Sequence, residues 1–111
     1  MPGETALALA AFYGFEAIVR YLVEKGGAGI DIPAVEGGTA LTGATINGHK
    51  RIATYLIDKG ANVNVRTKEG STPLKLAAQS EHEAIVQRLL EKGADPNQAD
   101  MKGRLFFSQF G

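Results

Sequence analysis

The sequence contains no cysteine, no net charge and no long apolar run, and each absence excludes a class of protein. Without cysteine the chain has no disulfide framework, no thiolate nucleophile and no cysteine-built zinc site. Twelve basic and twelve acidic residues cancel, so no overall charge attracts nucleic acid or an anionic membrane surface. No apolar stretch approaches the roughly 20 residues of a membrane span. We therefore expect an intracellular, cytoplasmic protein, with the nucleus as an open alternative, and neither nucleic-acid binding nor membrane insertion.

Groups that support catalysis are also scarce. The only histidines, His49 and His82, stand 33 residues apart, each just before a helical pattern. The run from Glu81 to Glu83 places two acids beside His82, but adjacent residues on a helix do not face each other, so the run is a poor metal site. None of the glycines belongs to the phosphate-binding run G-x-x-x-x-G-K-S/T. The sequence predicts no enzymatic activity, no cofactor and no metal.

The sequence is rich in internal repeats. The pentad Gly-x-Thr-Ala/Pro-Leu occurs at residues 3–7, 37–41 and 70–74, with spacings of 34 and 33 residues, and Gly103 follows after another 33. A second pattern, two apolar residues, an acid, lysine and glycine, recurs near residues 22–26, 56–60 and 89–93. Self-similarity at such a period is typical of a solenoid, in which each unit buries its apolar face against its neighbours.

These repeats resemble the ankyrin repeat, a unit of about 33 residues whose signature includes Thr-Pro-Leu-His-x-Ala. The resemblance covers the whole chain and implies a mainly α fold, a solenoid of helix-turn-helix units joined by β-hairpin loops. It predicts one ankyrin-repeat domain over 1–111, with repeats 3–36, 37–69 and 70–102. A partial repeat at 103–111 is expected to form a short apolar cap. The signature histidine is missing from every copy, which puts the contacts that it makes between repeats in doubt.

Individual residues fit roles in such a fold. Thr5, Thr39 and Thr72 precede the helical patterns and are expected to cap the free amides of the first turn. Gly14 and Gly48 are expected to end the first helices in the left-handed conformation, whereas Glu81 stands at this position in repeat three and predicts local strain. Gly43 weakens the first helix of repeat two. The positions expected to pack inward from the second helices are Ile18, Leu22, Val23, Ile52, Leu56, Ile57, Ile85, Leu89 and Leu90.

The resemblance implies a function in binding, because the family holds protein partners on a concave surface formed by hairpin tips and first helices. We therefore predict a non-catalytic protein–protein interaction module. By register with the family, the residues expected to contact the partner are Phe12, Tyr13, Val35, Glu36, Ile46, Asn47, Arg66, Lys68, Glu69, Gln79, Met101, Lys102 and Arg104.

Several alternatives stay open at this stage. Phe12 and Tyr13 are either anchors for a partner or packing residues for a preceding repeat. The basic C-terminal half, with Lys68 and Arg104, either steers an acidic peptide or forms a solvated rim. The module is either free-standing or a regulatory or targeting segment of a larger enzyme or channel, and a groove for a small molecule is a further alternative. Uncapped ends also predict a possible homodimer.

Overall fold

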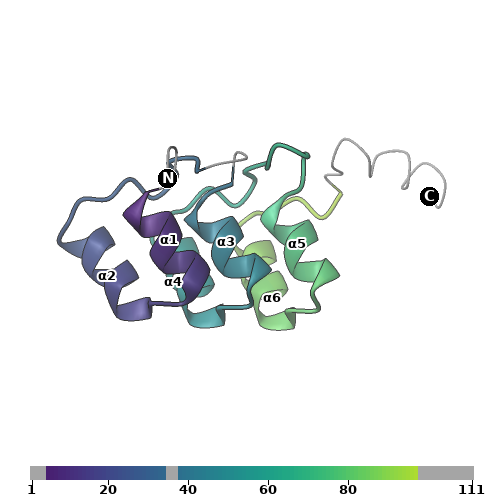
Figure 1. Cartoon of the computed structure of the whole chain (residues 1–111). Helices are drawn as coiled ribbons and strands as arrows, with labels where there is room; N and C mark the ends of the chain where they lie inside the picture. Colours follow the sequence, from purple (N-terminus) through teal and green to yellow (C-terminus); the bar gives the residue numbers. More distant parts are fainter. Residues whose placement is uncertain (1–4, 35–37, 98–111) are drawn as a thin grey trace.

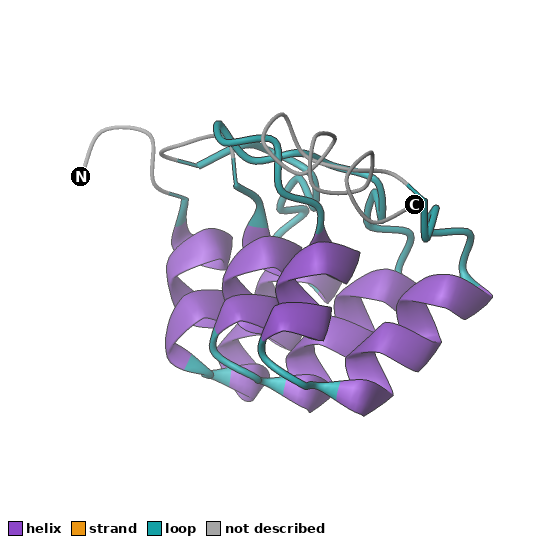
Figure 2. Ribbon diagram, turned by 90° about the vertical axis from the view of Figure 1, so that its right-hand side faces the viewer, coloured by secondary structure: helices purple, strands orange, loops and turns teal. Residues whose placement is uncertain are grey.

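The computed structural model describes residues 5–34 and 38–97, which form six helices in three pairs. The helices are α1 (Ala6–Tyr13), α2 (Glu16–Glu24), α3 (Ala40–Ile46), α4 (Lys50–Asp58), α5 (Pro73–Gln79) and α6 (Glu83–Glu91). Figure 1 shows the pairs side by side in sequence order, with α1, α3 and α5 in one layer and α2, α4 and α6 behind. Figure 2 shows the long loops between repeats collected at one end of the helices. The predicted stack of helix-turn-helix units is confirmed.

The predicted β-hairpins are not formed as strands over 5–34 and 38–97. The loop between repeats two and three turns back on itself through two backbone bonds, from the Thr67 amide to the Ser71 carbonyl at 2.9 Å and from the Gly70 amide to the Thr67 carbonyl at 2.8 Å. A similar bond of 2.6 Å joins the Ala34 amide to the Gly38 carbonyl. One or two such bonds close a turn but are too short a ladder to make a pair of strands. The loop around Thr67 to Ser71 therefore reverses direction as a hairpin does, without a pair of strands.

The helix starts follow the expected chemistry at two of three positions. The Thr5 hydroxyl accepts a hydrogen bond from the Ala8 amide at 2.9 Å, and the Thr72 hydroxyl accepts one from the Lys75 amide at 3.2 Å. The Thr39 hydroxyl lies opposite the Thr42 amide in a capping-box arrangement, but it makes no hydrogen bond within the described part of the chain. Thr42 takes over, accepting from the Thr39 amide and donating to the Thr39 carbonyl at 2.8 Å each. This arrangement keeps two threonine side chains packed under the start of α3.

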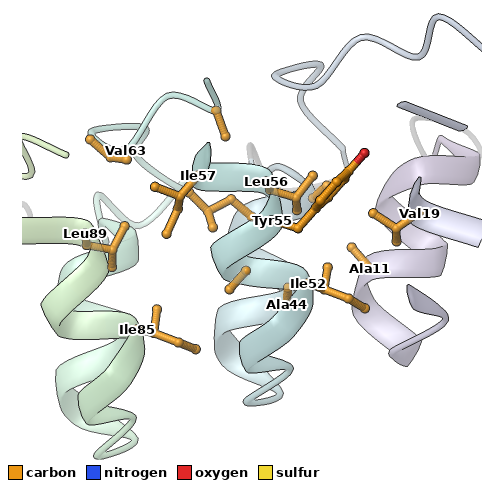
Figure 3. Close-up of a cluster of buried hydrophobic side chains, with 14 of the residues drawn as sticks. Ala11, Val19, Ala44, Ile52, Tyr55, Leu56, Ile57, Val63, Ile85 and Leu89 are labelled. Carbon is orange, nitrogen blue, oxygen red and sulfur yellow. The ribbon is translucent and has the colours of Figure 1, made fainter. Parts of the chain in front are cut away.

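The core lies between the layers and between neighbouring repeats (Figure 3). Five of the positions predicted to pack inward are buried, and Leu22 and Val23 pack against the core while partly buried. Ile18 and Leu90 are corrections, since both are exposed. The reason is positional: Ile18 stands where Ile52 and Ile85 face a preceding repeat, and Leu90 stands where Ile57 faces a following one. The fully or nearly buried side chains among the predicted set are those of Ile52, Leu56, Ile57, Ile85 and Leu89.

The turns between paired helices use left-handed backbone. Gly14 and Gly48 have φ angles of 84° and 72°, and Glu81 adopts φ 60° at the corresponding position of repeat three. The predicted strain in repeat three is thereby confirmed, because a side chain with a Cβ is disfavoured in this region by roughly 1–2 kcal/mol.

Replacing Glu81 by glycine is expected to stabilise the chain by about 1 kcal/mol, because glycine adopts a positive φ without steric cost. The measurement is the free energy of unfolding from urea denaturation. Ser80→Gly is the matched control, since Ser80 has φ −96° and glycine there only adds conformational freedom to the unfolded chain. Equal effects of the two substitutions would contradict the strain.

Candidate protein-interaction groove

A groove of about 460 Å³ lies between the first helices and the inter-repeat loops. Helices α1 and α3 form one side, and the loop residues around Thr67 to Ser71 form the other, with Leu76 of α5 at one end. The lining residues of the groove are Ala8, Leu9, Phe12, Tyr13, Ala34, Gly38, Thr39, Thr42, Gly43, Ile46, Thr67, Lys68, Glu69, Ser71 and Leu76.

The helical side of the groove is apolar and exposed. Leu9, Phe12, Tyr13 and Ile46 keep between 41% and 60% of their surface accessible. The rings of Phe12 and Tyr13 meet edge to face, with centroids 5.1 Å apart. Two repeats thus contribute side chains to one apolar strip, which is the arrangement expected of a binding surface rather than of scattered surface residues.

The loop side of the groove carries charge. Lys68 and Glu69 are exposed next to Thr67 and Ser71 on the loop after repeat two. The turn is held by the Thr67 hydroxyl, which accepts from the Ser71 amide at 3.2 Å, and by the Gly70 amide, which donates to the Thr67 carbonyl at 2.8 Å. The groove therefore presents an apolar wall to one side and a charged, hydrogen-bonding wall to the other.

The structure brings together five of the thirteen residues that the sequence proposed for partner contact. Phe12, Tyr13, Ile46, Lys68 and Glu69 line the groove. Asn47, Arg66 and Gln79 are exposed but do not line it. The remaining five, Val35, Glu36, Met101, Lys102 and Arg104, lie outside the described residues.

Asn47 has a structural contact that the sequence did not reveal. Its side-chain amide donates to the Phe12 carbonyl at 2.7 Å, and Nε2 of His49 lies 2.9 Å from the same oxygen. Both groups bind a carbonyl at the end of α1 that has no partner within the helix. They fix the last turn of α1, and with it Phe12 and Tyr13, against repeat two.

Sequence reasoning did not predict that Leu9 and Gly43 line the groove. Leu9 precedes Phe12 and Tyr13 by three and four residues, so helical spacing alone places the three on one face. Gly43 had been recognised only as a weak point of its helix. In the structure Gly43 lines the groove beside Phe12, and a Cβ at Gly43 would lie at an ordinary contact distance of 3.6 Å from the Cα, Cβ and Cδ1 atoms of Phe12.

The two histidines serve the stacking of repeats. A Cβ atom at Gly14 would lie 2.7 Å from Cε1 of His49, and one at Gly48 would lie 2.6 Å from Cε1 of His82. Each imidazole therefore rests directly on a glycine of the preceding repeat. Within the described part of the chain, no three acidic or histidine side chains lie together in a way that could hold a metal ion.

A second depression, of about 440 Å³, lies over the second helices and is charged. Its central residue is Tyr55, whose hydroxyl donates to Glu24 at 2.7 Å and whose ring lies 4.5 Å below the Arg20 guanidinium. Burial, followed by the bond to the Glu24 carboxylate, raises the pKa of Tyr55 to about 12. These contacts link repeats one and two. The lining residues are Arg20, Glu24, Arg51, Thr54, Tyr55, Asp58 and Lys59.

A further ion-pair network crosses the same boundary. Nε of Arg20 and Nε of Arg51 each lie 3.0 Å from an oxygen of Glu16. Hydrogen bonds from Arg20 and then Arg51 hold the pKa of Glu16 below its ordinary value. Most of these side chains are already paired with each other, so we interpret the depression as a set of contacts that joins the repeats, called the Tyr55 brace below. The apolar groove is the better candidate for binding.

Stacked helix-turn-helix pairs, left-handed glycines after the first helices and an open groove beside the loops define an ankyrin-type repeat stack. The family described as ankyrin repeats (three copies) matches residues 2–67 and 27–100. The chain belongs to the ankyrin-repeat family.

Two curated relatives share part of the stack. Both are called ankyrin repeat and SAM domain-containing protein 6, one from mouse and one from rat. Each is 44% identical over 66 residues, which is 60% of this chain and 8% of the relative. The chain thus matches only a small part of those proteins. None of the helices over 5–34 and 38–97 has the length and apolar character that crossing a bilayer requires.

The brace around Tyr55 predicts a loss of stability at high pH. Because the pKa of Tyr55 is raised on folding, its stabilising contribution is complete below about pH 10, the value of a free tyrosine, and is lost as the pH rises toward 12. Urea denaturation midpoints of the unmodified chain should therefore fall more steeply between pH 9.5 and 11.5, taken as a rough working window, than those of Tyr55→Phe. If the midpoints of the unmodified chain and of Tyr55→Phe fell in parallel with pH, Tyr55 would make no such contribution to stability.

Proposed function

We propose that this ankyrin stack binds a protein segment in the groove between the first helices and the inter-repeat loops, and that it acts by recognition without catalysis. The observation that carries the proposal is the strip of Leu9, Phe12, Tyr13 and Ile46, four exposed apolar side chains from two repeats that line one groove. Large exposed apolar surfaces in a folded domain mark interaction sites. Aromatic side chains at the centre of such surfaces commonly supply most of the binding free energy.

The rigidity of the strip supports the proposal. Phe12 and Tyr13 sit on the last turn of α1, which Asn47 and His49 hold against repeat two. Ile46 sits on the last turn of α3, which packs between α1 and α5. Side chains on packed helices lose little freedom when a partner arrives, so less of the binding free energy is spent on ordering the surface.

The charges around the loop suggest the chemistry of the partner. Arg66, Lys68 and Lys75 are the cations of the loop and of the first turn of α5, and Glu69 is the acid among them. The proposed partner places an apolar side chain on the strip and an acidic stretch along the loop. The charged wall then contributes mainly to orientation and association rate, and the strip to affinity.

The stack also fits a place as the targeting segment of a larger protein. The favouring observation is the small share, 8%, that the match occupies in the two relatives, whose names include a SAM domain beside the ankyrin repeats. The same groove would serve in either setting, and we propose an intracellular setting for both.

Affinity capture with the double variant Phe12→Ala/Ile46→Asp tests the groove. Partners of the unmodified chain should be lost, because removal of one central anchor alone weakens binding by about 2 kcal/mol, or roughly thirtyfold. Leu90→Asp is the matched control, since Leu90 is a similarly exposed aliphatic residue that does not line the groove. All variants are first checked by thermal unfolding. A partner that binds the double variant and the unmodified chain equally refutes the groove.

Lys68→Glu tests the acidic part of the partner. With a captured partner, the association rate constant should fall about threefold at low ionic strength and recover at high salt, because screening removes long-range attraction. Glu69→Lys on the same loop should accelerate association. Rates that do not respond to either substitution at low salt contradict the steering.

A further inference from the structure

Outside the groove, a second set of large apolar side chains is exposed at the free side of repeat one. Phe15, Ile18 and Tyr21 are spaced by three residues at the start of α2 and along it, so they share one face of the helix. All three are more than half exposed. Figure 1 shows α2 as the outermost of the second helices, with no helix on its far side among the described residues.

The isoleucine position of this face is covered in both other repeats, and the tyrosine position is covered in repeat two. Ile18 is 51% exposed, whereas the equivalent Ile52 and Ile85 are 2% and 1% exposed. Tyr21 is 69% exposed, whereas the equivalent Tyr55 is 7% exposed. At these two positions repeats one and two have the same residue type and different exposure, so this part of α2 has the composition of an interface between repeats.

The contacts inside the stack show what covers the equivalent positions of repeats two and three. In repeat two the Tyr55 hydroxyl donates a hydrogen bond to Glu24, the acid at the end of the second helix of repeat one. In repeat three the equivalent Arg88 bonds the equivalent Asp58, with Nη2 2.9 Å from Oδ2. At the position of Phe15, repeats two and three carry His49 and His82. Their rings rest on the left-handed glycines that follow the first helices of the preceding repeats.

We propose that Phe15, Ile18 and Tyr21 are the docking face for one further ankyrin repeat, stacked on repeat one as repeat one is on repeat two. The occupant carries a carboxylate at the end of its second helix, which accepts a hydrogen bond from the Tyr21 hydroxyl. It carries a left-handed glycine after its first helix, to leave room for the Phe15 ring. The face shares no residue with the lining of the groove, and this proposal does not depend on the proposed function.

The free side of repeat three in a second copy of this chain does not meet these requirements. It offers an acid, Glu91, at the end of its second helix, but Glu81 stands where the glycine is needed. A Cβ at that position in repeats one and two would lie within 2.7 Å of the ring that rests there, so the Phe15 ring would have to move. The occupant is therefore a repeat with glycine at this position and not repeat three of another copy.

An extended chain tests the proposal. A copy of residues 37–69, which supplies both Gly48 and Asp58, is joined directly ahead of Gly3. Hydrogen exchange of the amides in α2 should slow at least tenfold relative to the 111-residue chain. Ile18→Lys should leave exchange in the 111-residue chain nearly unchanged, because the side chain is exposed there, and should abolish the slowing in the extended chain.

A matched extended chain carries glutamate in place of the glycine of the added copy that corresponds to Gly48. The added repeat then has at this position the residue that Glu81 is in repeat three. Its α2 amides should exchange faster than those of the first extended chain. The proposal is overturned if the added repeat does not slow exchange, or if it does so equally with Ile18→Lys. Sedimentation of the 111-residue chain provides a further arm. Self-association that Ile18→Lys abolishes identifies a second copy as the occupant and also overturns the proposal.

Discussion

The structure depends on one constraint: no repeat buries its own apolar face, so each relies on its neighbours. The isoleucine at the same position of the three second helices shows this directly, since it is half exposed in repeat one and almost completely buried in repeats two and three. In a stack of this kind, stability is the sum of weak units and strong interfaces between them. Most of the specific contacts described above, including the Tyr55 brace, lie on those interfaces.

Close approach between repeats explains why glycine is placed where it is. Gly14 and Gly48 reverse the chain with a positive φ and also accept an imidazole ring at a distance that a Cβ would not allow. Glu81 also turns the chain with a positive φ, at a steric cost, but its Cβ occupies the space that a ring of a following repeat would need, which makes repeat three a poor platform for a regular neighbour. Absent side chains thus shape the stacking of the repeats.

Local chemistry made much of the fold predictable, and dependence on neighbours limited the rest. The period, the paired helices, the caps at Thr5 and Thr72 and the strain at Glu81 follow from short patterns that act within one repeat. The exposure of Ile18 and Leu90 could not be predicted in this way. Both are residue types of a hydrophobic core, and whether they are buried depends on the presence of a neighbouring repeat. The exchange of roles between Thr39 and Thr42 also escaped, since two threonines three residues apart offer equivalent hydroxyls. In the groove, register located Phe12 and Ile46, whereas Leu9 required helical spacing to be applied across the strip.

The groove and the docking face of α2 meet at one aromatic contact. Tyr13 lines the groove, and its ring stacks on Phe15 of the docking face with centroids 6.2 Å apart. Repeat one, like repeat three, packs on one neighbouring repeat only within the described residues. A repeat stacked on Phe15 would contact a ring that itself contacts Tyr13, so the docking face and the groove are linked through this one aromatic pair.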